Sequence, residues 1–363
     1  MSGRRLAATA AVLGVAAAVF VRVHSRPLDG APPAAELGDL VTLYYPMLRY
    51  AAAEVAAGRL PLWNPYQSCG EPLLANPGLT LFYPLYLPLL VLPTDVALRL
   101  DLVLHLTIAG AGVAALAWYG GGGLAAGLIG GLIYGFAGGM LFKANYPGFL
   151  PGVAWLPWLL LAVLCLIDAP SRRRLVAAAA SAALLACGNP QFVYFAVLLL
   201  LPLAGAAWWA RRGGGLGAPL AALAAALALA VLLTLVRSLP GLEYMRDTWR
   251  AGALPLAAVS ALAIAPADLL RHLVLADPRP NLISVARNEA YLGVVPLALA
   301  LVGALGGAPR RLALPLAAGG LGAALYAMGA ATPVLPLLAR LPGGTAFRGP
   351  NRALIITDLA VAV

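Results

Sequence analysis

Residues 216–236 read LGAPLAALAAALALAVLLTLV, an apolar run without a single charged side chain. A helix of about 20 apolar residues is long enough to cross the hydrocarbon core of a bilayer. Leu and Ala dominate the run, and the alternation expected of a barrel strand is absent. The stretch therefore predicts a transmembrane helix and not the core of a soluble domain.

The rest of the chain has the same character. Of its 363 residues, 62% are hydrophobic and 10% are charged, whereas soluble domains have about 25% charged residues. We therefore predict an all-α fold, a polytopic transmembrane helix bundle that forms one transmembrane domain over residues 1–363. About ten spans are expected, near residues 5–23, 97–118, 121–142, 151–167, 175–188, 191–210, 216–236, 290–308, 312–330 and from 352 onward.

The positions of the basic residues predict how the bundle is oriented. Arg4-Arg5, Arg172–Arg174, Arg211-Arg212 and Arg310-Arg311 lie in short connections, and such connections face the cytoplasm. We expect a multi-pass protein of the bacterial plasma membrane with a cytoplasmic N-terminus. Residues 5–23 are expected to stay as a span, because no small-residue cleavage site follows them. The net charge of +10 does not indicate nucleic-acid binding, since no soluble basic domain is present.

Two long connections are then left on the outer face, the first long loop at about 24–96 and the second at about 237–289. In the first, Leu40, Leu43, Met47 and Tyr50 recur at helical spacing, which predicts a helix over 40–57 that lies on the membrane surface. Asp39 stands before this helix, and two interpretations are open. It is an N-cap, or it is a carboxylate at the water–lipid boundary that acts as a general base or binds a sugar hydroxyl.

A dense group of polar and aromatic residues, GRLPLWNPYQSCGEP at 58–72, follows this helix. Trp63 and Tyr66, with Tyr83 and Tyr86 further on, suit the aromatic belt of a membrane interface. A belt does not explain the amide and carboxylate side chains among them. Aromatic faces beside such groups suit carbohydrate, so the predicted substrate-binding residues are Trp63, Asn64, Tyr66, Gln67 and Glu71. The proline-rich stretch 79–93 is expected to be re-entrant or interfacial.

Further substrate-binding candidates lie towards the end of the chain. Arg348 and Arg352 are four residues apart, so they share a face if one helix holds both. Arginine binds phosphate oxygens in a bidentate manner, although both residues also fit as snorkelling anchors. Glu289 and Tyr291 begin an expected span, where an acid is either a site residue or a helix-start carboxylate.

Other charged residues lie within or beside expected spans. Asp101 and His105, four residues apart, are expected to form a structural pair. Asp358 is expected to pair with Arg352, and Lys143 to face the same cavity as the outer arginines. The histidines and cysteines have no metal-ligand spacing, and no Asp-x-Asp pair occurs.

The first long loop resembles a known family. GDLVTLYYPMLRYAAAEVAAGRLPLWNPYQSCGEPLLANPGLTLFYPLYLPLLVLP, at 38–93, is similar to the opening outer loop of YfhO-type bacterial membrane proteins. Further similar stretches follow in order: GNPQFVYF at 188–195, SLPGLEYMRDTWRAG at 238–252, NEAYLGVVPLALA at 288–300 and FRGPNRALIITDLAVA at 347–362. That family is similar to integral-membrane glycosyltransferases of the GT-C class.

The resemblance implies a helical bundle that transfers a sugar from a polyprenyl-phosphate carrier to a glycan, polymer or lipid acceptor of the cell envelope, on the non-cytoplasmic face. Asp39 is then the catalytic candidate, binding or deprotonating the acceptor hydroxyl. Some GT-C enzymes use a divalent cation, but no residue pattern here requires one. Family members usually continue beyond the stretch DLAVAV, so the chain is expected to be a truncated or short member. Two alternatives stay open: a transporter or flippase of a lipid-linked or small polar solute, and a non-catalytic accessory protein.

Overall fold

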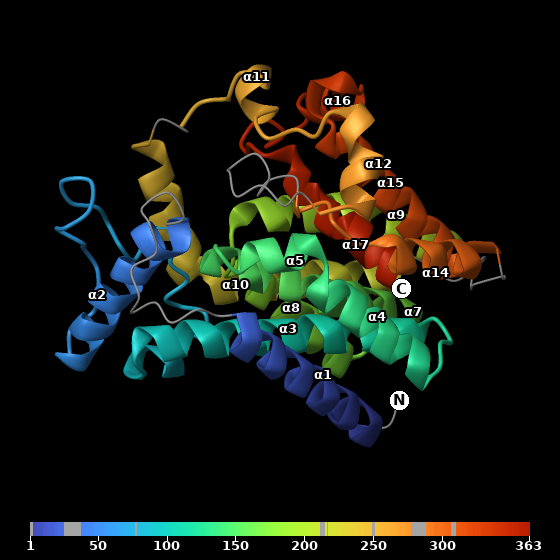
Figure 1. Cartoon of the computed structure of the whole chain (residues 1–363), viewed down its shortest axis with the longest axis horizontal. Coiled ribbons are helices and arrows are strands. Elements are labelled where there is room, and N and C mark those ends of the chain that lie inside the picture. Colours follow the sequence, from blue (N-terminus) through green and yellow to red (C-terminus); the bar gives the residue numbers. More distant parts are fainter. Residues whose placement is uncertain are drawn as a thin grey trace.

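A computed structural model of the chain describes residues 3–24, 38–76, 78–210, 215, 217–248, 251–276, 288–305 and 310–363 (Figure 1). Regular structure in this described part is helical, apart from an isolated β-bridge between Asn64 and Glu71. The prediction of an all-α fold is confirmed. The α-helices are α1 (Gly3–His24), α2 (Tyr45–Ala56), α3 (Thr94–Tyr119), α4 (Leu124–Phe136), α5 (Gly138–Lys143), α6 (Leu150–Ala154), α7 (Leu156–Asp168), α8 (Arg172–Ala186), α9 (Pro190–Ala210), α10 (Gly217–Arg246), α11 (Leu256–Val259), α12 (Pro266–Val274), α14 (Val294–Leu305), α15 (Arg310–Ala327), α16 (Val334–Leu338) and α17 (Leu354–Ala362).

Within the described ranges, five helical segments are long and apolar enough to cross a membrane. They are Gly3–Arg22, Thr94–Tyr119, Pro147–Asp168, Pro190–Ala207 and Gly217–Arg246, and the shorter apolar helices are Leu124–Phe136, Val294–Leu305 and Leu312–Ala327. Repeated apolar helices of this length make the chain a multi-pass membrane protein. The expected run 121–142 divides at Ala137, whose extended backbone (ψ 150°) separates α4 from α5.

The helix α10 is longer than the sequence pattern predicts. The expected span ends at residue 236, before Arg237, but the helix continues to Arg246. The Arg237 guanidinium donates hydrogen bonds to the backbone oxygens of Ala186 (3.0 Å) and Gly188 (2.8 Å). These carbonyls lie at the C-terminal end of α8, where a cation is favourable. The arginine is therefore held by a neighbouring helix and does not end its own.

The centre of the bundle forms around α3, which packs against α1, α4 and α7. A Cβ atom on Gly110 of α3 would lie 2.9 Å from the Gly131 oxygen of α4, and one on Gly131 would lie 2.8 Å from the Gly110 oxygen. Small residues at such crossings let two membrane helices approach closely. This close approach brings α4 and α5 against the centre of the bundle.

The first long loop docks on this bundle through its own apolar cluster. Met47, Leu48 and Ala51 of α2 pack with Leu73 and Tyr83, and with Cys187 at the end of α8. In Figure 1, α2 lies beyond the end of the bundle where α3 begins. The predicted helix is therefore present, as a π-helical turn Leu40–Tyr44 followed by α2, and Gly58 follows it with a left-handed φ of 72°.

Tyr83 and Tyr86 do not belong to an interfacial belt, so that expectation is wrong for these two residues. They are 0% and 2% exposed. Burial is tolerated because their hydroxyls have hydrogen-bond partners inside the bundle. Trp155 donates to the Tyr83 oxygen (2.7 Å), which lies 3.0 Å from His105 Nε2. We assign the Tyr83 hydroxyl as the donor to Nε2. The hydrogen of the neutral imidazole then lies on Nδ1.

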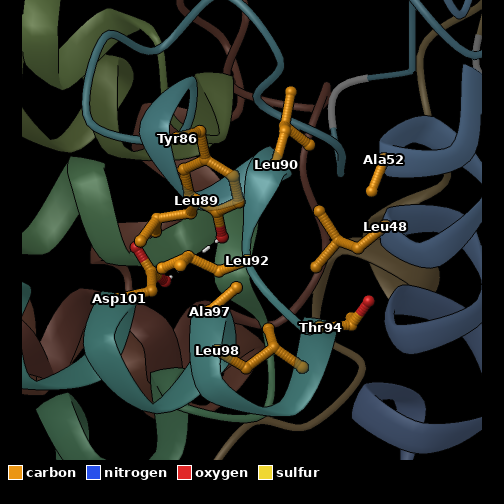
Figure 2. A pocket seen from close by; sticks show the side chains of 10 residues that line it. All are labelled: Leu48, Ala52, Tyr86, Leu89, Leu90, Leu92, Thr94, Ala97, Leu98 and Asp101. Carbon is orange, nitrogen blue, oxygen red and sulfur yellow. Dashed lines mark hydrogen bonds between the residues drawn. The ribbon is translucent and has the colours of Figure 1, made fainter. Parts of the chain in front are cut away.

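The predicted pair of Asp101 and His105 is confirmed, with Nδ1 2.9 Å from the Asp101 Oδ1 atom. Asp101 is one of the residues that line a crevice between α2 and the start of α3 (Figure 2), and the Tyr86 hydroxyl donates to its Oδ2 atom at 3.2 Å. The crevice encloses about 10 Å³, which is roughly the room that one water needs. Asp101 is thus a structural residue that anchors the first long loop to α3.

Candidate functional site

Asp39 enters the first long loop's helical segment with its carboxylate exposed. Its backbone is already helical (φ −52°, ψ −27°), and its side chain makes no capping hydrogen bond. The N-cap interpretation is therefore not supported by the structure. The charge of this carboxylate acts on Tyr44 and Tyr146. Burial is the larger cause that raises the pKa of each hydroxyl above the ordinary value for tyrosine, and the negative charge of Asp39 is the second.

Tyr146 connects Asp39 to a set of aromatic rings from another part of the chain. Its ring meets Tyr44 edge to face, with centroids 6.2 Å apart. On its other side, Tyr146 stacks on Phe149 with centroids 5.0 Å apart. The Arg352 guanidinium lies over the Phe149 ring, 4.8 Å from its centroid, as a cation–π contact. Residues from both ends of the chain therefore meet around Tyr146.

Arg352 is fixed by a second contact besides this ring. Its Nη1 donates to the Gln191 Oε1 atom at 2.9 Å, and the Gln191 amide in turn donates to the backbone oxygens of Arg348 (3.1 Å) and Gly349 (3.3 Å). The positive charges of Arg352 and Arg348 both act to lower the pKa of the Tyr146 hydroxyl. Asp39, Tyr146 and the two arginines are thus grouped in one region.

No single helix holds both Arg348 and Arg352, so the condition for a shared helical face is not met. Gly349 has a left-handed φ of 77°, and the 3₁₀ turn begins after it at Pro350. Arg348 therefore precedes the turn and Arg352 lies within it. The expected pairing of Asp358 with Arg352 is wrong, because Arg352 bonds Gln191 and neither Asp358 oxygen has a hydrogen-bond partner in the described part of the chain.

A buried polar cluster supports the Arg352 turn from within. Glu289 accepts hydrogen bonds from the Lys143 ammonium group and from the Asn351 amide. Lys143 and Glu289 are each 1% exposed, so both charges are removed from water and must neutralise each other. Glu289 is therefore not placed to touch a substrate. Glu289 joins α5 to the turn that carries Arg352. The backbone oxygen of Tyr291, two residues further on, accepts a hydrogen bond from the Gly138 N–H (2.7 Å).

Two loops beside Tyr146 approach each other so closely that only glycine fits. A Cβ atom on Gly148 would lie 2.6 Å from the Gly78 backbone oxygen. The Gly148 oxygen accepts from the Asn189 N–H at 2.8 Å, so the loop is also held by the segment that precedes α9. The contact positions Tyr146 against the first long loop.

We expect Gly148→Ala to destabilise the protein by about 1–3 kcal/mol, because the added methyl group meets backbone rather than a flexible side chain. Gly205→Ala is the matched control, since a Cβ atom at Gly205 meets nothing within 4 Å. Thermal unfolding of the purified variants in detergent measures the difference. An unfolding temperature for Gly148→Ala equal to that of Gly205→Ala would show that the two loops are not in contact.

The polar and aromatic residues at 58–72 form a separate hairpin. Asn64 and Glu71 exchange backbone hydrogen bonds of 2.8 and 2.9 Å, and the Asn64 side chain accepts from the Tyr66 N–H at 3.1 Å. Trp63 and Tyr66 are 52% and 84% exposed, as the belt interpretation expects.

The polar side chains of this hairpin bond within the loop or to α10. Asn64 Nδ2 lies 3.5 Å from Gln67 Oε1, and Glu71 accepts from Asn76 at 3.1 Å and from Tyr244. Burial raises the pKa of the Glu71 carboxyl. A cavity of about 340 Å³ between this hairpin and the end of α10 includes Glu243, Tyr244 and Asp247 in its wall. The sequence-based candidates are therefore divided between this hairpin and the Arg352 region.

The described residues contain no group of three or more His, Cys, Asp and Glu side chains that could hold a metal ion. Near Arg352, the carboxylate of Glu289 is already bound by Lys143 and Asn351, which leaves Asp39 as the exposed anionic ligand among the residues grouped there. One carboxylate does not make a binding site for a divalent cation. The residues described at this site do not fit a resident metal.

No protein-family model matches the chain, and no curated protein matches it. The resemblance to YfhO-type proteins therefore stays a prediction. Among solved structures, the chain is similar to the arabinofuranosyltransferase AftD from mycobacteria, with 17% sequence identity and a TM-score of 0.49. The similarity covers 100% of this chain and 24% of that one, so the chain spans about a quarter of the length of that structure.

Proposed function

We propose that this protein is a membrane glycosyltransferase that takes a sugar from a polyprenyl-phosphate carrier and transfers it to a hydroxyl of a cell-envelope acceptor. The observation that carries the proposal is the grouping of an exposed carboxylate, Asp39, with Arg352 and Arg348 around Tyr146. A glycosyl transfer from a phosphate carrier needs both charges, a base for the acceptor and cations for the leaving group.

In the proposed reaction, the acceptor hydroxyl attacks the anomeric carbon of the donor sugar. Asp39 accepts the proton of that hydroxyl as the new glycosidic bond forms. The bond between the anomeric carbon and the phosphate oxygen breaks, and its electron pair stays with the carrier phosphate. Arg352 stabilises this charge, and its guanidinium is already oriented by Gln191 and Phe149, so little reorganisation is needed during the reaction.

The surroundings of Arg352 suit a lipid carrier. A cavity of about 500 Å³ between α9 and α15 has an apolar wall that includes Ala353 and Ile356, which follow Arg352 in the chain. An isoprenoid chain in this cavity would place its phosphate near the turn that holds Arg352. This placement supports a lipid-linked donor over a soluble nucleotide sugar.

We propose a plasma-membrane location with the arginine-rich ends of α1 and α8 in the cytoplasm, because the positive-inside rule places them there. Asp39 and Arg352 then face the outer side, where a lipid-linked donor is available.

Donor turnover by the reconstituted protein tests the proposal, with a panel of polyprenyl-phosphate-linked pentoses and hexoses. We expect Arg352→Gln to weaken the use of the accepted donor at least about tenfold in kcat/KM, because a charged hydrogen bond to phosphate contributes about 1.5–3 kcal/mol. Arg340→Gln is the control, because Arg340 is an exposed cation after α16. The absence of turnover with every donor would contradict the proposed function, and equal loss in both variants would contradict the role of Arg352.

A further inference from the structure

Another cavity lies at the opposite end of the bundle from the proposed transfer site. It has a volume of about 480 Å³ and lies where α3 ends and α4 begins, with Arg5, Trp118, Tyr119 and Leu124 in its wall. In Figure 1, this end of α3 and the N-terminus lie far from α2 and the first long loop. The proposed glycosyl transfer uses none of these residues.

The charged groups at this cavity are predominantly positive. The Arg5 guanidinium lines it and is exposed. A second cation, Arg174, donates to the backbone oxygens of Cys165 (2.8 Å) and Ala169 (2.9 Å) beside the cavity. The acid Asp168, close to Arg174 in sequence, accepts from the Tyr119 hydroxyl at 2.6 Å. Among the described residues no carboxylate pairs with Arg5, so an anion entering the cavity meets an unneutralised guanidinium.

Part of the cavity wall is apolar. Ala115 and Leu161 also line the cavity, and each lies about one helical turn from the residues at its mouth, Tyr119 and Cys165. Trp118 and Tyr119 are amphipathic rings of the kind that lie at the depth of lipid headgroups. Trp118 donates to the Gly123 oxygen at 3.0 Å, so its ring is held in place at the mouth.

We propose that this cavity binds an anionic phospholipid, with its phosphodiester at Arg5 and the first part of an acyl chain against Ala115 and Leu161. A basic cavity between membrane helices attracts acidic headgroups, and the apolar part of the wall requires a ligand that also has a hydrocarbon part. A small free anion matches the first feature and not the second. This proposal does not depend on the glycosyltransferase activity.

Native mass spectrometry of the detergent-solubilised protein tests the proposal, with equimolar phosphatidylglycerol and phosphatidylcholine. We expect the protein to retain phosphatidylglycerol preferentially. Arg5→Gln is expected to reduce its affinity about fivefold, since one arginine at a membrane surface contributes about 1 kcal/mol. Arg4→Gln removes the same charge from the neighbouring residue, which does not line the cavity, and is expected to leave the affinity unchanged.

Three results would overturn the proposal. The first is equal retention of the two lipids. The second is the same affinity in Arg5→Gln as in the unaltered protein, or an equal loss in Arg4→Gln, which would indicate a diffuse charge effect. The third is displacement of phosphatidylglycerol by an equal concentration of glycerol phosphate, which would identify a free-anion site.

Discussion

Asp39→Asn is expected to lower kcat for glycosyl transfer by about 10²–10⁴-fold, the usual contribution of a general base. The amide keeps the size of the side chain but cannot take the proton of the acceptor hydroxyl. Folding should be unaffected, because the Asp39 side chain is exposed and makes no capping hydrogen bond. Transfer from the accepted polyprenyl-phosphate donor in proteoliposomes, together with the thermal unfolding temperature, measures both effects.

Glu54→Gln is the matched control for this variant. Glu54 lies in α2, the helix that follows Asp39 and the π-helical turn. Its carboxylate pairs with Arg59 at 2.7 Å. Glu54 is half-buried but its partner is exposed, so removing this charge is expected to leave transfer unchanged and to change stability only slightly. Full transfer activity in Asp39→Asn would remove Asp39 from the mechanism while leaving the fold assignment intact.

Lys143→Met is expected to destabilise the protein by about 3–5 kcal/mol, because it leaves the buried Glu289 carboxylate without its counter-charge. The side chains of Lys143 and Glu289 are each 1% exposed, so water cannot replace the lost partner. Denaturant unfolding in detergent measures the change in the free energy of unfolding. The control is Arg340→Met, which removes an exposed cation and is expected to have little effect.

The double variant Lys143→Met with Glu289→Gln separates charge from packing. It removes both charges and keeps an acceptor for the Asn351 amide, which donates to Glu289. We expect it to be more stable than Lys143→Met alone, since residue 289 no longer carries a charge that lacks its partner. A double variant that is less stable than either single variant would show that the two side chains do not act as an ion pair.

The sequence predicts the helical elements well where periodicity and length act together. The apolar runs of α3, α9 and α10 exceed what a soluble core helix needs, so their assignment as membrane helices requires no tertiary information. The contact between Asp101 and His105 is predictable for the same local reason, because residues four apart in a helix are neighbours. Their partner Tyr83, from the first long loop, is not predictable in this way.

The candidate site is only partly predictable, because its geometry depends on contacts between distant segments. Asp39 and Arg352 are chosen by residue type, and their grouping around Tyr146 is a tertiary result. Gln191 and Asn351 are missed, because an amide in an apolar sequence does not indicate which side chain it will bond. Glu289 is found as a candidate, but the sequence cannot distinguish a substrate contact from a buried bond to Lys143.

The division of the Arg352 region between the two ends of the chain has a consequence for biosynthesis. The proposed base, Asp39, is made soon after α1, whereas the proposed cation, Arg352, is made after every described α-helix except α17. Under the proposed function, a product that terminates before Arg352 lacks one half of the transfer site and is expected to be inactive. Under the proposed function, two co-expressed fragments split at an intervening connection are expected to bring Asp39 and Arg352 together only when they associate.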